Sequence, residues 1–373
     1  MKRRGDHSVP SRKIARKSSF NLVKLPNDVI QSVFQYLAAS DIINLASTCH
    51  DYRNELIQYL YSNIKVRWND LIDIREKLPP VLNRYASFIK YLRIIDYYSY
   101  GEWQIDIFQN VLTKLPNLRG LLVNSINSSN WLKYRTNSKI EKLTLYFDIS
   151  ANCPLPHQTQ VVSTNPKIFH LAHIANFSRL THLNLSSYHF NWDPSDLMPE
   201  NHLQSLTIEN CTWEYPFQLS QFNHYNTLNF CQITYSNNNP FILSERFTNF
   251  LNDPLNAKST SLQTLFIEFK HYDDINWKKH LSLKQFQTLI DPSKFPHLQC
   301  ILLHGWLFNL RSFMHYVNQN FLKLEMALLD LLVEVTDSDI SPDNFQSFRQ
   351  SALRSMTEHH PNVRFKLDLQ LPY

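Results

Sequence analysis

The chain has 373 residues, of which 43% are hydrophobic and 13% aromatic, enough apolar material for the cores of two or three domains. It contains only four glycines and no cluster of them, which argues against a glycine-rich phosphate-binding loop. Its five cysteines are widely spaced without a C-x-x-C pair. This spacing argues against a disulfide framework or a thiolate zinc site, and it favours reduced thiols in the cytosol or nucleus.

The formal net charge of +5 is concentrated at the beginning of the sequence. Residues 1–19 hold seven Lys or Arg and one acid, a net +6, so the rest of the chain sums to −1. A body of balanced charge lacks the basic face that nucleic acid requires, so no nucleic-acid partner is expected. No run of 18 apolar residues or secretory signal is found, so neither membrane contact nor secretion is expected.

Residues 1–20 are predicted to form a disordered basic tail. Its two basic clusters, KRR and RKIARK, are similar to a bipartite nuclear-import signal, and we expect the protein in the nucleus and cytoplasm. The alternatives for this tail are a solvated arm without a specific role and a segment that makes weak nucleic-acid contacts.

Residues 21–60 have the pattern of a helical hairpin. Pro26 and Asn27 suit the start of the first helix, and Ser40 is predicted to cap the second, with Asp41 near its positive end. The first helix has one broad apolar stripe, formed by Val29, Ile30, Val33, Phe34 and Leu37. The apolar side of the second helix is predicted to comprise Ile42, Ile43, Leu45, Ala46 and Cys49.

The residues of this hairpin resemble the F-box at many positions. The matching residues are Leu25-Pro26, Val29, Val33-Phe34, Leu37, Asp41-Ile42, Leu45, Cys49 and Tyr52-Arg53. The departures are Thr48 for the usual Val, Asp51 near the usual basic residue, and Tyr52 for Trp, which keeps an aromatic side chain. The resemblance implies binding to Skp1, the adaptor that connects F-box proteins to cullin and RING subunits. We select Leu25, Pro26, Ile30, Phe34 and Leu37 as the Skp1-binding surface, because exposed apolar residues favour association. Val33, Leu45 and Cys49 are expected to hold the helices together.

Residues 61–84 are predicted to form a helical linker that ends near Pro79-Pro80. From residue 85 to 373 the pattern L-x-x-L-x-L recurs, often after a similar lead-in such as LPNLRGL, FSRLTHL, FPHLQCI or HPNVRFK. The expected triplets are Ile89/Leu92/Ile94, Leu118/Leu121/Val123, Ile140/Leu143/Leu145, Leu180/Leu183/Leu185, Leu203/Leu206/Ile208, Tyr225/Leu228/Phe230, Leu262/Leu265/Ile267, Leu298/Ile301/Leu303 and Leu328/Leu331/Val333, with a closing strand at 363–369.

This pattern resembles an irregular leucine-rich repeat, which implies an α/β solenoid with a curved parallel sheet. The Asn or Cys that the family places eight residues after the first leucine, where it satisfies backbone groups, occurs clearly only as Cys211. An unrelated α/β domain with several L-x-L strands is the alternative.

Residues that alternate with the leucines are expected to face outward and to bind a protein substrate. They are Arg93, Tyr146, His182, Asn184, Glu209, Phe266, Glu268 and His304. No arginine cluster is visible among them, so the sequence gives no indication of a phosphorylated target.

No sequence pattern for an enzyme active site, a metal site or a cofactor site is found, and no cofactor is expected. Histidine pairs such as His170 and His173 are expected by chance among 16 histidines. We therefore expect a non-catalytic substrate receptor of an SCF (Skp1–cullin–F-box) ubiquitin ligase. The alternatives are an F-box protein that acts outside a ligase, a nuclear repeat scaffold and an enzyme with dispersed catalytic residues.

Overall fold

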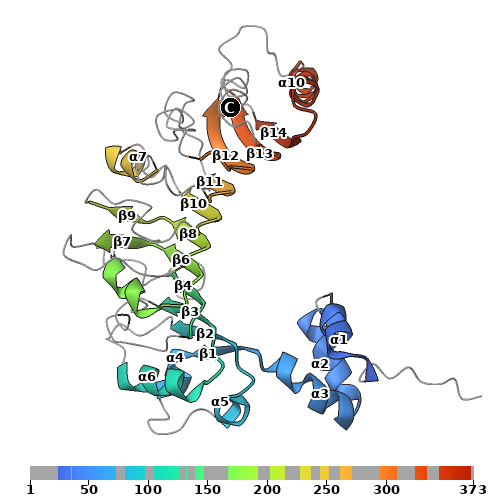
Figure 1. Ribbon diagram of the computed structural model, residues 1–373, viewed down its shortest axis with the longest axis vertical. Coiled ribbons are helices and arrows are strands. Elements are labelled where there is room, and N and C mark those ends of the chain that lie inside the picture. Colours follow the sequence, from blue (N-terminus) through green and yellow to red (C-terminus); the bar gives the residue numbers. More distant parts are fainter. Residues whose placement is uncertain are drawn as a thin grey trace, which may run out of the picture. The chain divides into compact units, whose positions relative to one another are not determined.

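The computed structural model describes residues 24–34, 36–72, 80–96, 105–125, 132, 139–146, 167–191, 202–214, 227–236, 244–251, 261–270, 295–308, 324–333 and 344–370 (Figure 1). The predicted basic tail lies outside these ranges. The chain divides into two compact units, Met1–Ser62 and Asn63–Tyr373, which are described separately.

The first unit consists of three helices: α1 (Asn27–Phe34), α2 (Ala39–Thr48) and α3 (His50–Leu60). Its core contains Ile30, Phe34, Ala46 and Leu56. The ring of Phe34 meets that of Tyr59 edge to face, with 4.8 Å between centroids. The hairpin predicted for this region is confirmed, and α3 completes its packing because Leu56 and Tyr59 lie one turn apart on one face.

The start of α2 differs from the prediction. The helix begins at Ala39, and the backbone N–H of Ala38 donates to the Asp41 carboxylate at 3.0 Å. Asp41 therefore satisfies the backbone at the start of the helix, in place of the predicted Ser40 cap. Cys49 has extended backbone between α2 and α3, and its Sγ accepts from the N–H of Tyr52 at 3.5 Å. Cys49 is exposed and caps α3, so the prediction that its side chain packs on the apolar side of the second helix and holds the helices together was wrong.

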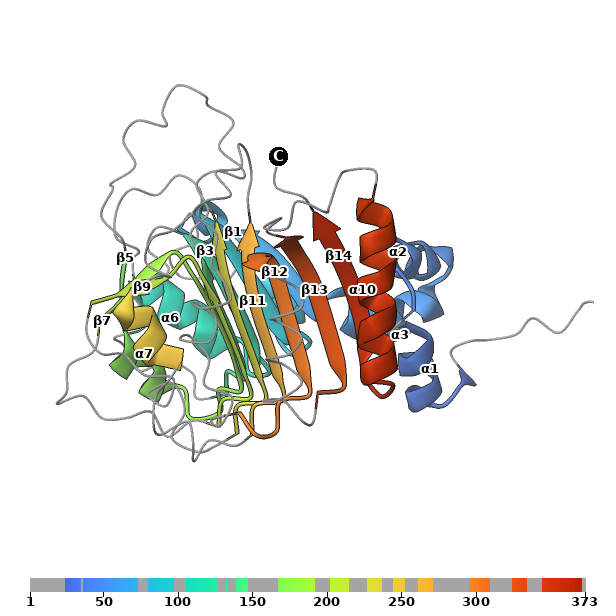
Figure 2. The same cartoon turned by 90° about the horizontal axis from the view of Figure 1, so that it is seen from above.

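The second unit contains an 11-stranded sheet in which every adjacent pair of strands is parallel, in the order β1-β2-β3-β4-β6-β8-β10-β11-β12-β13-β14. The strands are β1 (Asn63–Arg67), β2 (Tyr91–Asp96), β3 (Gly120–Ser125), β4 (Lys142–Tyr146), β6 (His182–Ser186), β8 (Ser205–Glu209), β10 (Phe230–Ser236), β11 (Thr264–Lys270), β12 (Cys300–Phe308), β13 (Met326–Val333) and β14 (Arg364–Gln370). The strands lie side by side when viewed from above (Figure 2).

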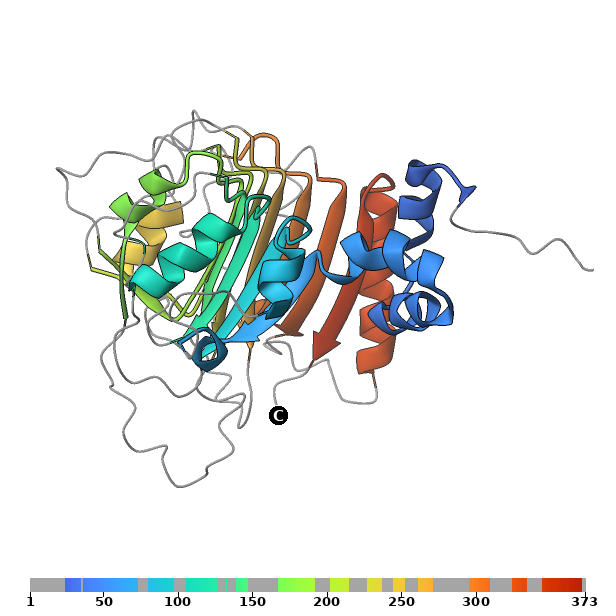
Figure 3. The ribbon, with the colours of Figure 1, turned by 90° about the horizontal axis from the view of Figure 1, so that it is seen from below.

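Helices and a second sheet accompany this large sheet. The helices are α4 (Trp68–Ile72), α5 (Pro80–Tyr85), α6 (Ile105–Lys114), α7 (Glu245–Leu251) and α10 (Phe345–His359), with a 3-10 helix at Leu171–Asn176. The second sheet is parallel and consists of β5 (Lys167–His170), β7 (Tyr188–Asn191) and β9 (Thr212–Trp213). Helix α6 lies alongside the first strands (Figure 3), and its residues Phe108 and Val111 belong to the main core.

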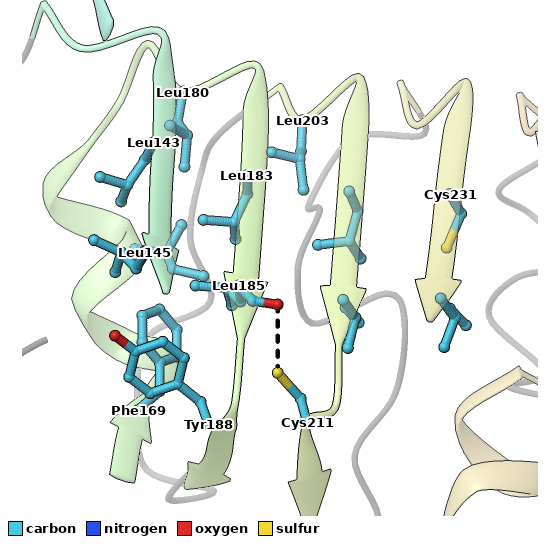
Figure 4. Packing of buried hydrophobic residues seen from close by; sticks show 14 of the residues in the cluster. Leu143, Leu145, Phe169, Leu180, Leu183, Leu185, Tyr188, Leu203, Cys211 and Cys231 are labelled. Atoms are coloured by element: carbon cyan, nitrogen blue, oxygen red, sulfur yellow. Dashed lines mark hydrogen bonds between the residues drawn. The ribbon is translucent and has the colours of Figure 1, made fainter. Parts of the chain in front are cut away.

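The leucine triplets form continuous buried rows across the large sheet (Figure 4). Leu143 pairs with Leu183, which pairs with Leu206, and the row formed by Leu145 and Leu185 runs beside it. These side chains are at most 2% exposed. The alternation of apolar residues therefore determines the register, because a shift of one residue would turn every leucine to the opposite face.

The recurrent lead-in forms the same turn wherever it occurs. In each copy the N–H of the fourth residue donates to the carbonyl of the first, as in Leu118 to Leu115 at 3.2 Å and Leu180 to Phe177 at 3.0 Å. The copies at 295–298 and 360–363 do the same at 3.1 and 3.0 Å. The lead-in is therefore a structural element that returns the chain to the start of the next strand.

Two residues with positive φ connect the large sheet to the second sheet. Ser187 (φ 65°) lies between β6 and β7, and Asn210 (φ 50°) lies just before β9. The N–H of Ser187 donates to the carbonyl of Glu209 in β8 at 2.8 Å, and the N–H of Asn210 donates to the carbonyl of Thr234 in β10 at 2.9 Å. The Cys211 thiol donates to the carbonyls of Leu185 and Glu209 at 3.5 and 3.3 Å, so it satisfies backbone groups after the strand as predicted (Figure 4).

The structure corrects the segment predicted as a helical linker. Residues 63–67 form β1, whose Ile64 and Val66 pair with Leu92 and Ile94 of β2 and pack against the core. The segment NIKVR alternates apolar and polar residues with the period of a strand, and helix occurs only after it, in α4 and α5.

Two of the predicted triplets are also corrected. The register pairs Leu206 with Cys231 and Ile208 with Ile233, so the buried triplet in β10 is Leu228/Cys231/Ile233, and Phe230 faces outward. In β13 the register pairs Ile301 with Ala327, so the triplet begins at Leu324, four residues before the predicted Leu328.

Candidate protein-binding surfaces

Helix α1 has two adjacent apolar faces. Ile30 and Phe34 are only 8% and 7% exposed and pack into the three-helix core. On the neighbouring face Val29 is 40% exposed, and Tyr36, in the turn just after the helix, is 89% exposed. Helical geometry explains the division, because residues one position apart are separated by about 100° around the axis.

We call this exposed surface the outer stripe of α1, and it consists of Val29 and Val33 of the helix, Pro26 just before the helix and Tyr36 in the turn after it. Pro26 is exposed, whereas Val33 is half-buried at the margin of the core. Ile43 of α2 is a further exposed apolar residue of this unit, at 54%. Water-exposed apolar side chains of this kind favour association with a partner.

The predicted Skp1-binding residues fall into three groups. Pro26 is exposed, Leu25 and Leu37 are half-buried against the core, and Ile30 and Phe34 are buried within it. The choice of Ile30 and Phe34 as surface residues was wrong, because the broad apolar stripe covers two faces and their face packs against α2 and α3. Val33 and Leu45 contact the core as predicted.

The outward face of the large sheet is formed by the positions that alternate with the buried leucines. All eight predicted substrate-binding residues occupy such positions, in three adjacent rows that follow the strand register. Arg93, Asn184 and Phe266 belong to one row. Tyr146, Glu209, Glu268 and His304 belong to the next row, and His182 lies in the row before them.

Aromatic rings are a feature of this outward face. Phe230 and Phe266 meet edge to face, with ring centroids 5.2 Å apart. Tyr91, 39% exposed, lies over Gly120, where an added Cβ would clash with the tyrosine ring. Glycine at this position leaves the space that the ring occupies. Aromatic side chains of this kind are frequent anchors of protein–protein interfaces.

Polar groups of the face have specific partners. Thr234 donates to the Glu268 carboxylate at 3.3 Å, and Nδ1 of His182 lies 2.8 Å from the Thr181 hydroxyl. Desolvation by burial, together with the positive charge of Lys142, lowers the pKa of His182. His182 is therefore mostly neutral at pH 7, when it can both donate and accept a hydrogen bond.

The buried cysteines are unsuited to chemistry. Burial raises the pKa of both Cys211 and Cys231 to about 12, so these thiols stay protonated at neutral pH. In the described ranges, no group of three or more His, Cys, Asp or Glu side chains is arranged to hold a metal ion. Among the helices that the structure describes, none is long and apolar enough to cross a membrane.

Comparison with known proteins identifies the first unit. Residues 22–54 match the F-box domain, a range that includes α1 and α2 and the start of α3. The chain carries an F-box domain. A search of curated proteins gave no match. Among solved structures, a crystal structure of a protein from Bacteroides fragilis is similar over 75% of this chain and 76% of its own, with 12% identity and a TM-score of 0.32.

Sequence reasoning missed part of both surfaces. Within the F-box unit it assigned Val29 no surface role and did not consider Tyr36, although the spacing of Pro26, Val29, Val33 and Tyr36 is itself helical. On the sheet it missed the outward residues of β1, Lys65 and Arg67, because that segment was assigned to a helical linker. The alternation of NIKVR was the signal that could have identified them.

Proposed function

We propose that this protein is the substrate-recognition subunit of an SCF ubiquitin ligase. The match of residues 22–54 to the F-box domain supports this proposal most strongly, because F-box domains in general bind Skp1. The exposed outer stripe of α1 supplies an apolar surface for that contact, to which Val29 and Tyr36 contribute exposed side chains. Through Skp1 the protein joins the cullin and RING subunits.

The second unit is proposed to bind the target protein as a leucine-rich-repeat-like domain. Three features support this assignment: the in-register rows of buried leucines, the recurrent turn before the strands and the cysteine that satisfies backbone carbonyls after β8. The outward face of a parallel sheet presents a broad, nearly continuous array of side chains, which suits an extended protein partner.

The proposed mechanism is proximity. One unit binds Skp1 and the other binds the target, so the ubiquitin-conjugating enzyme of the ligase meets the target at high effective concentration. The chain performs no bond chemistry itself in this mechanism. Its proposed location is the nucleus and cytoplasm, supported by the two basic clusters of the tail.

Co-expression with Skp1, cullin and the RING subunit tests the proposal. The full chain is expected to co-purify with all three, and combined Leu25→Ala and Pro26→Ala substitutions are expected to reduce recovery of all three together. Gln58→Ala, at an exposed position on α3, serves as the control and is expected to leave recovery unchanged. Recovery of Skp1 without cullin would contradict the ligase role and favour a function outside it.

A further inference from the structure

The outward face of the first four strands carries an excess of positive charge. Its basic residues, all exposed, are Lys65 and Arg67 of β1, Arg93 of β2 and Lys142 of β4. The outward positions of β1–β4 contain no acidic residue. This cationic patch was not visible in the sequence, because two of its four members lie on the strand that was predicted as linker.

The strand register places the cations close to one another. Lys65 pairs directly with Arg93, and adjacent strands lie about 4.8 Å apart. Ile64 and Val66 pack against the core, so Lys65 and Arg67 must face the other way. In the described part of the chain none of the four cations forms a salt bridge. Like charges on directly paired positions repel each other, and an anionic ligand would remove this cost.

An apolar surface lies beside the cations. Tyr91 occupies the same strand as Arg93, and its ring covers Gly120 on β3. Lys142 is the next residue along this row, on β4. Exposed aromatic rings bordered by cations provide both contact area and charge, a combination found at the energetic centres of protein interfaces.

The rest of the outward face differs in charge. On β6 to β12 it carries the acids Glu209 and Glu268 and a single basic position, Lys270. On β13 and β14, the basic Arg364 and Lys366 are accompanied by acids at the outward register positions 330 and 368. Uncompensated positive charge on the described outward face is therefore concentrated on β1–β4.

We propose that this cationic patch binds an anionic segment of the target protein, with carboxylate or phosphate groups contacting Lys65, Arg67, Arg93 and Lys142. The inference rests on the proposed function, whose target-binding surface it specifies. Three strand spacings span about 14 Å, and an extended peptide advances about 3.3 Å per residue, so about four to five residues cover the patch.

Charge distribution favours a peptide over nucleic acid as the ligand. A phosphodiester strand that continued along the face beyond β4 would meet Glu209 and Glu268, which repel it. A short acidic or phosphorylated segment ends before reaching them, and the rest of the target can then contact the aromatic and polar residues of β6 to β12.

The test is fluorescence anisotropy with the full chain and labelled hexapeptides: hexaglutamate, a peptide of alternating phosphoserine and glycine, and hexaglutamine. Lys65→Glu with Arg93→Glu is the test variant, and Arg364→Glu with Lys366→Glu is the matched control. Both variants change the net charge equally on the same face, and both retain the basic tail. The test variant is expected to bind the anionic peptides about tenfold more weakly, whereas the control stays within about twofold of the parent.

Tighter binding of hexaglutamate would identify carboxylate as the anionic group that the patch binds, and tighter binding of the phosphopeptide would identify phosphate. Equal losses in the two variants, or equal binding of hexaglutamine, would overturn the proposal. Tighter binding of a single-stranded oligonucleotide that is lost in the test variant would identify a nucleic-acid surface instead. Self-association lost in the same variant would identify a second copy of the chain as the occupant. Skp1 binding, measured on the same samples, is expected to be unchanged, so failure of this inference is distinguishable from failure of the proposed function.

Discussion

Substitutions on the two faces of α1 are expected to weaken Skp1 binding for different reasons. Val29→Asp changes the outer stripe, and Phe34→Ala removes a ring from the core. We expect both variants to lose affinity for Skp1, but only Phe34→Ala to lose the fold of the first unit. This contrast separates residues that contact the partner from residues that shape the surface.

The magnitudes follow from exposure and packing. Fully burying a valine side chain is worth about 1.5–3 kcal/mol, and Val29 is still 40% exposed, so covering the remainder contributes about 1 kcal/mol. Burying a carboxylate without a partner adds about 1–3 kcal/mol, so Val29→Asp is expected to weaken Skp1 binding by about 30-fold or more. Removing a buried phenylalanine costs about 3–5 kcal/mol, comparable to the whole stability of a small core.

The assay combines Skp1 titration with hydrogen exchange of peptides that cover residues 27–60. Phe34→Ala is expected to lose amide protection in all three helices, whereas Val29→Asp keeps it. Gln58→Asp introduces the same residue at an exposed position of α3 and is expected to change neither measurement. Unchanged Skp1 affinity in Val29→Asp, or full protection in Phe34→Ala, would refute the division of α1 into a binding face and a core face.

Three further predictions concern backbone geometry in the second unit and the accessibility of the cysteines. Gly120→Ala is expected to displace the tyrosine ring that lies over it and lower the free energy of unfolding by about 1–3 kcal/mol, measured by urea denaturation. Asn210→Val, at φ 50°, is expected to cost about 1–3 kcal/mol in the same assay, and Asn210→Gly, which tolerates this φ, is expected to cost less than Asn210→Val. Cys49 is expected to react with a thiol reagent in the native protein, whereas Cys211 and Cys231 react only after unfolding. Because burial raises the pKa of these two thiols from 9.0 to about 12, their contribution to stability is complete below pH 9 and falls as the pH rises toward 12.

The sequence predicted most of the large sheet because two of its signals are local. A leucine such as Leu183 is buried by the alternation of its own strand, and a turn such as Phe177–Leu180 is encoded by the lead-in itself. The errors arose where a repeat lacks one of the leucines of the L-x-x-L-x-L pattern. Cys231 occupies a leucine position, so the pattern was aligned three residues too early and Phe230 was assigned to the core.

The functional surfaces were less predictable, since they depend on which face of a helix or strand is covered by other parts of the protein. Periodicity identified α1 as an apolar helix but did not reveal that Ile30 packs against its own unit while Val29 stays exposed. That outcome depends on α2 and α3. Similarly, the cationic pair of Lys65 and Arg93 joins residues 28 positions apart in the chain, and it exists only because β1 adds to the edge of β2.

The most direct test of the account is the mass of the complex formed by the full chain and purified Skp1, measured by size-exclusion chromatography with light scattering. The account predicts a stable complex of one chain with one Skp1 at micromolar concentration, and its loss in Val29→Asp but not in Gln58→Asp. Separate elution of the parent chain and Skp1 would contradict the claim that this protein acts through an F-box.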